Sequence, residues 1–147
     1  MKPNSMRLAF PAVLFLIAHT ALAQISAGTK AFHAIEFRPG MKTAVVKGSV
    51  SPSKTVGPDM TNDGFETYSL RSSAGHHLTM EISSDDHQAM FSLVKPSPGG
   101  AKHEFVEKAA RVKRWSGTLA MTGDYRITVF TREQEGVSRF KLRVTLR

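Results

Sequence analysis

The sequence predicts an all-β fold, an antiparallel β-sandwich of about eight strands. Short segments throughout residues 24–147 alternate apolar with polar side chains, which is the period of a strand with one buried face. Each segment carries one apolar and one polar stripe, as an antiparallel sheet facing water on one side requires. Turn-forming glycine, proline, asparagine and aspartate residues separate the segments.

The N-terminal 23 residues have the three parts of a secretory signal peptide. Lys2 and Arg7 give a positive start, an apolar run follows over residues 8–18, and Ala21-Leu22-Ala23 forms a small-x-small cleavage site. The apolar run is shorter than the ~20 residues of a membrane-spanning helix. We therefore expect export to the periplasm and cleavage near Ala23/Gln24.

Residues 24–147 are expected to form a single β-sandwich domain. The strands are expected, in order, at residues 32–37, 43–50, 65–72, 78–82, 89–93, 115–119, 125–129 and 140–146. The alternation turns one set of apolar side chains inward, listed along the chain as Ala44, Val46, Val50, Tyr68, Leu70, Leu78, Met80, Ile82, Ala89, Phe91, Leu93, Leu119, Tyr125, Ile127, Val129, Phe140, Leu142, Val144 and Leu146. Gly48 inside its strand predicts a bulge or the close approach of another backbone.

Two long loops, and the segment that follows the second of them, depart from short hairpins. Residues 51–64 and 95–103 are long, polar and rich in helix and strand breakers, and such loops on a β scaffold often bind partners. Residues 104–113 place Phe105, Ala109 and Val112 near helical spacing, so a short helix or an irregular crossover is expected there.

Composition limits the environment and the partners. The chain has no cysteine, so an exported domain must be held by its core and its hydrogen bonds alone. Lys and Arg number 20 against 12 Asp and Glu, a net charge of +8. A basic surface suits anionic partners such as lipopolysaccharide, acidic glycan or an acidic protein patch. The cations are spread over most segments, which favours an ordinary solvated surface.

Residues that could carry chemistry do not form a motif. His76-His77 and Asp85-Asp86-His87 match no zinc or calcium spacing, and neighbouring strand residues point to opposite faces, so we expect no metal and no cofactor. Glu66, Glu81 and Glu104 offer glycosidase carboxylates in principle, but no catalytic motif accompanies them, so we expect a protein that is not an enzyme. Trp115, the only tryptophan, is expected in the core, with sugar stacking as the alternative.

The order of the segments itself resembles a known group. Ala74-Gly75 with the following alternating strand, and Thr122-Gly123-Asp124-Tyr125 with its strand, are similar to the bacterial pre-peptidase C-terminal-like β-sandwich. Within that group the chain resembles the periplasmic inhibitors of g-type lysozyme, through Glu36-Phe37-Arg38-Pro39-Gly40, Thr67-Tyr68, the same Thr122–Tyr125 hairpin and Thr131-Arg132.

The resemblance implies a protein inhibitor that inserts loops into the peptidoglycan-binding cleft of a lysozyme. It implies that Thr122 presents its hydroxyl to the catalytic region, that Arg132 pairs with an acidic group, and that Gly123 allows a positive φ. Tyr125 would pack the hairpin. The family's cleft-entering tyrosine is absent from the loop at 51–64, where only Asp63 or Phe65 lies near its position. The alternative is a glycan- or envelope-protein-binding module that inhibits nothing.

Overall fold

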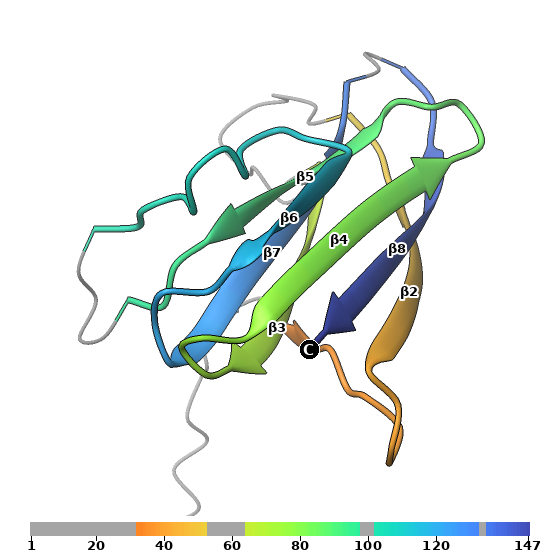
Figure 1. Cartoon of the computed structure of the whole chain (residues 1–147). Helices are drawn as coiled ribbons and strands as arrows, with labels where there is room; N and C mark the ends of the chain where they lie inside the picture. Colours follow the sequence, from red (N-terminus) through yellow and green to blue (C-terminus); the bar gives the residue numbers. More distant parts are fainter. Residues whose placement is uncertain (1–31, 53–63, 98–101, 133–134) are drawn as a thin grey trace, which may run out of the picture. The chain divides into compact units, whose positions relative to one another are not determined.

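The strands form two sheets that pack face to face, with the apolar side chains of each sheet between them (Figure 1). The structure is a computed structural model that describes residues 32–52, 64–97, 102–132 and 135–147. One sheet, which we call sheet A, has the order β1 (His33–Ala34), β3 (Phe65–Ser72), β7 (Gly123–Thr131) and β5 (Ala89–Val94). The other, sheet B, has the order β2 (Thr43–Val50), β8 (Ser138–Leu146), β4 (His77–Ser84) and β6 (Arg114–Thr118).

The predicted fold class is confirmed. All neighbouring strands pair antiparallel except the two-residue β1, which runs parallel to β3 with His33 opposite Tyr68. The predicted first strand, residues 32–37, is shorter than expected, because only His33 and Ala34 form β1. The backbone N–H of Ile35 adds one more hydrogen bond to β3, to the carbonyl oxygen of Ser69 at 2.8 Å. The predicted signal peptide and Asp63 lie outside the described residues. Among the described residues no helix is long and apolar enough to cross a membrane.

The core consists of the residues that the alternation turned inward. Tyr125, Phe91, Leu70 and Leu78 are among its largest fully buried side chains. Both sheets contribute, so the apolar stripes of β3, β5 and β7 pack against those of β4 and β8. Four predicted inward residues are only partly buried and pack around this core, namely Ala44, Val46, Trp115 and Leu146.

Gly48 does mark a close approach, but of side chains and not of a backbone. A Cβ atom added at Gly48 would lie 2.7 Å from Cζ of Phe140 and 3.0 Å from the Tyr68 hydroxyl oxygen. The two rings meet edge to face with centroids 6.4 Å apart. Gly48 therefore leaves room for this aromatic pair to pass beneath β2.

The helix considered for residues 104–113 is wrong. The segment runs beside β5, where Phe105 bridges Val94 and Val112 bridges Phe91. The backbone N–H of Val106 donates to the carbonyl of Leu93, and that of Leu93 donates to Ala109, at 2.9 and 2.8 Å. Two of its residues, Lys108 and Arg111, have φ of +57°, which ends any helical turn. These bonds satisfy an edge strand that would otherwise expose unpaired backbone groups.

Candidate functional site

The predicted contact residues fall at two opposite ends of the sandwich. β7 joins them, with Gly123 paired to Ser72 at one end and Phe130 paired to Phe65 at the other. A nine-residue strand separates its ends by about 26 Å. We call the first the Thr122 end and the second the Arg132 end. The structure brings Thr122, Gly123 and Tyr125 together, and it places Phe65 and Arg132 elsewhere.

At the Thr122 end, a buried tyrosine holds an exposed turn. The Tyr125 side chain is 1% exposed. Its hydroxyl donates to the carbonyl oxygen of Met121 at 2.9 Å and accepts from the N–H of Met121 at 3.1 Å. Tyr125 therefore holds the turn from the core side, and almost all of its ring is buried.

Two further contacts hold the same turn. The Oγ1 atom of Thr122 accepts the backbone N–H of Ala74 at 2.9 Å, which ties the turn to the neighbouring one at residues 73–76. Gly123 has φ of +148°, and a Cβ atom there would lie 2.8 Å from Cβ of Pro96. Only glycine combines this backbone angle with that close contact. The positive φ expected at Gly123 is confirmed.

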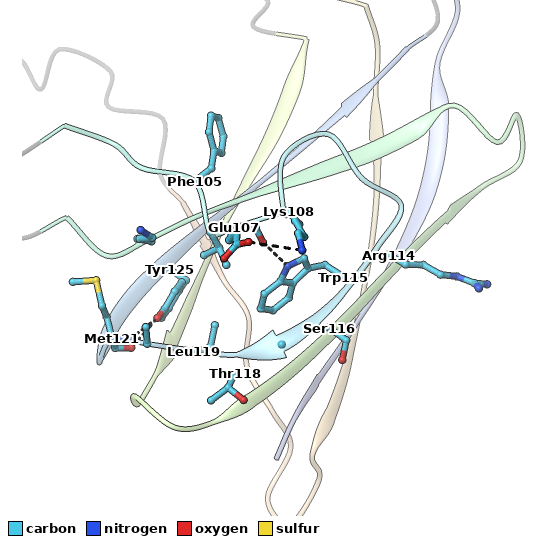
Figure 2. A pocket seen from close by; sticks show the side chains of 14 residues that line it. Phe105, Glu107, Lys108, Arg114, Trp115, Ser116, Thr118, Leu119, Met121 and Tyr125 are labelled. Carbon is cyan, nitrogen blue, oxygen red and sulfur yellow. Dashed lines mark hydrogen bonds and ion pairs between the residues drawn. The ribbon is translucent and has the colours of Figure 1, made fainter.

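An open groove of about 860 Å³ adjoins the Thr122 end. It lies between β6 and the segment that covers β5, and Figure 2 shows its side chains. Met121 and Tyr125 line the groove as well as belonging to the turn, so the two features are continuous. Apolar side chains contribute most to it, with Phe105 56% and Met121 37% exposed.

Trp115 was expected in the core, but its position at the groove was not predicted from the sequence. Its indole packs on the core as expected, but it is only partly buried and lines the groove. Its Nε1–H donates to the carbonyl oxygen of Glu107 at 3.0 Å, which joins β6 to the covering segment (Figure 2). The sequence feature that could have indicated this groove position is a single tryptophan at the start of a strand, directly after an irregular segment.

Exposed ion pairs surround the groove without dominating it. Lys95 pairs with Glu104 at 3.0 Å, and Lys108 with Glu107 at 3.8 Å. Solvent screens such pairs, so each contributes ~0–1 kcal/mol. The groove is therefore an apolar surface with a mixed-charge rim, suited to a partner with an apolar and hydrogen-bonding contact area.

At the Arg132 end, a hydrogen-bonded carboxylate supports the loops. Asp86 accepts hydrogen bonds from the hydroxyls of Ser84 and Ser138 and, at 3.0 Å, from the N–H of Gln88. Desolvation raises the pKa of Asp86, but these hydrogen bonds outweigh it and lower the pKa to about 2. The backbone N–H of Arg132 donates to Gln88 at 3.1 Å, so this network also positions the exposed Arg132.

The other polar residues that the sequence singled out are distributed over the surface. His76 hydrogen bonds through Nδ1 to Ser72, and His77 through Nε2 to Ser116, at 3.1 and 2.9 Å. No group of three or more potential metal ligands occurs among the described residues. Glu81 pairs with Arg114, Glu104 with Lys95, and Glu66 lies on the other sheet from Glu81.

Comparison with known proteins shows a fold likeness without a sequence match. No known protein family and no curated protein matches this chain in sequence. Among solved structures, the periplasmic inhibitor of g-type lysozyme from Aeromonas hydrophila aligns with a TM-score of 0.59 and 22% identity, over 79% of this chain and 96% of that one. The Salmonella Typhimurium inhibitor aligns with a TM-score of 0.53 and 16% identity, over 78% and 96%.

A mutant of the corresponding Escherichia coli inhibitor aligns with a TM-score of 0.53 and 14% identity, over 78% of this chain and 96% of its own. These neighbours are periplasmic inhibitors and not enzymes. The family predicted from the order of the sequence segments is thus the one that the structure matches. The chain has the fold of the periplasmic inhibitors of g-type lysozyme.

Proposed function

We propose that the mature protein is a periplasmic inhibitor of g-type lysozyme that binds without catalysing a reaction. The single observation that carries the proposal is the restrained, exposed turn at Met121–Gly123 on a fold shared with such inhibitors. A loop already fixed in shape loses little conformational entropy on binding, and that lower cost adds directly to affinity. Residues 1–23 would direct export and be removed near Ala23/Gln24.

The Thr122 end is the end that enters the enzyme's cleft in this proposal. Thr122 is exposed, and because its oxygen already accepts from Ala74, its hydroxyl proton remains to donate to an acceptor on the enzyme. The exposed Met121 beside it and the adjoining groove enlarge the contact with apolar area. Tyr125 and Gly123 hold the turn in position for this contact.

Arg132 and Phe65 stay outside the cleft when the Thr122 end is inserted, because the two ends of β7 lie about 26 Å apart. A guanidinium in a desolvated ion pair costs ~2–5 kcal/mol when it is removed. Truncation of Arg132 therefore distinguishes the two ends, since a large loss of affinity would assign the cleft contact to the Arg132 end instead.

The test is a cell-wall lysis assay with purified residues 24–147 and goose-type, chicken-type and invertebrate lysozymes. We expect inhibition of the goose-type enzyme, at least a ~10-fold higher inhibitory concentration for Thr122→Val, which is ~1.4 kcal/mol, and little change for Arg132→Ala. Thr128→Val is the matched control, because Thr128 is a partly exposed threonine in the middle of β7, between the two ends. Absence of inhibition for all three enzymes contradicts the proposal. Retention on peptidoglycan without inhibition would favour the glycan- or envelope-binding alternative.

A further inference from the structure

The outward face of sheet B carries a group of cations that neither end of the sandwich uses. Alternate residues of β8 are exposed and basic, namely Arg139, Lys141 and Arg143, and Lys47 of β2 is exposed beside them. We call these four residues the cationic face. Side chains two residues apart on one strand lie on the same side and repeat every ~7 Å. The β8 cations therefore form a straight row, with Lys47 alongside.

The register sets two of these cations directly against each other. Lys47 of β2 pairs with Lys141 of β8, and the residue opposite Lys141 on its other side is Ser83 of β4. Like charges directly opposite in a sheet repel. Glu81, the acid opposite Arg143, is already held by Arg114, with Oε1 2.6 Å from Nη2. Among the described residues no ion pair involves any member of the cationic face.

A shallow hollow of about 890 Å³ opens on this face. Lys47, Arg139 and Lys141 line it together with Ser49, which lies opposite Arg139, and Ser83, which lies opposite Lys141. Asp85 is the one acid in the lining, with His87 beside it. The hollow thus offers three cations and two hydroxyl groups to a ligand against a single carboxylate.

We propose that the cationic face binds an acidic polysaccharide. The row of cations matches a chain that carries repeated negative charges, because each unpaired Lys or Arg can approach a separate anionic group. The hydroxyls of Ser49 and Ser83 beside the cations can donate to and accept from sugar hydroxyls. No Trp or Tyr lines the hollow and its one Phe, Phe140, is buried, whereas insertion into a lipid interface relies on exposed large apolar side chains. Binding also relieves the repulsion between Lys47 and Lys141.

The experiment uses residues 24–147 and alginate, a carboxylate-bearing polysaccharide, with dextran as the neutral comparison. Lys47→Gln/Lys141→Gln should weaken alginate binding at least ~10-fold, and binding should fall steeply between about 50 and about 500 mM salt as screening shortens the range of the charges. Arg38→Gln/Lys102→Gln is the matched control, since it removes two exposed cations away from this face. Thermal unfolding of the double lysine variant should occur at the same or a higher temperature, which shows that the fold is kept.

Three outcomes would overturn the inference. Equal loss of alginate binding in the two double variants would show that net charge alone matters. Equal binding of dextran and alginate would remove the anionic requirement. Binding to phosphatidylglycerol vesicles without binding to alginate would assign the face to a lipid surface. Lysozyme inhibition should be unchanged in Lys47→Gln/Lys141→Gln, because the face lies on neither end of β7.

Discussion

Tyr125→Phe tests whether the turn at Met121–Gly123 depends on one hydroxyl group. The change removes a single oxygen atom that makes two hydrogen bonds to the backbone of Met121, at 2.9 and 3.1 Å. A hydrogen bond contributes ~0.5–1.5 kcal/mol net, and the backbone of an exposed residue regains part of this from water. We therefore expect the free energy of unfolding to fall by about 1–2 kcal/mol, and the midpoint of thermal unfolding by about 4–8 °C.

Under the proposed function, the same substitution should also weaken lysozyme inhibition, because a loosened turn must be ordered again on binding. Tyr68→Phe is the matched control: the chain has two tyrosines, and no hydrogen bond joins the Tyr68 hydroxyl to another described residue. Calorimetry and the lysis assay on both variants give the comparison. Equal losses of stability for the two variants, or an unchanged Tyr125→Phe protein, would refute the role assigned to the Tyr125 hydroxyl.

Two further substitutions test the ends of the sandwich. Gly123→Ala places a Cβ atom against Pro96 at a φ that alanine rarely adopts, so it should destabilise the fold by about 1–3 kcal/mol in denaturant unfolding; an unchanged midpoint would contradict the packing described. Asp86 has its pKa lowered to about 2 in the folded state, so its contribution is complete above the unfolded pKa of ~3.9 and is lost as pH falls towards 2. Asp86→Asn should therefore lower the free energy of unfolding by about 1 kcal/mol at neutral pH, a figure reduced for solvent screening. The variant should also lose less stability than the wild type between pH 4 and 2, and an equal loss would contradict the role assigned to the Asp86 carboxylate.

Alternation was a reliable guide wherever one face of a strand is buried. Residues such as Leu70, Leu78 and Ile127 lie in the core because polar neighbours on either side force them there. For residues 104–113 the helical alternative is wrong, and the irregular crossover is the alternative that the structure shows. Phe105, Ala109 and Val112 have helical spacing, yet each contacts β5 at a point set by that strand's hydrogen bonds. A single sequence does not show which neighbouring edge an irregular segment will cover.

The candidate site was predictable in part. The turn residues Thr122 and Gly123, and the packing role of Tyr125, followed from the hairpin motif and the alternation after it. The resemblance implied that Thr122 and Arg132 contact the same partner. The alternation from Tyr125 to Val129, however, already predicted a strand that puts these two residues at its opposite ends. The groove was not predictable, because it depends on how the segment before Trp115 lies beside β6.

The length of β7 has a consequence for how this protein can diversify. Loops separated by a whole strand share no side-chain contacts, so amino-acid changes in one should combine additively with changes in the other. Substitutions in the turn that carries Thr122 can therefore accumulate while the Asp86 cluster and its neighbours stay unchanged. A scaffold with two loops that vary independently can change one surface contact without disturbing the other.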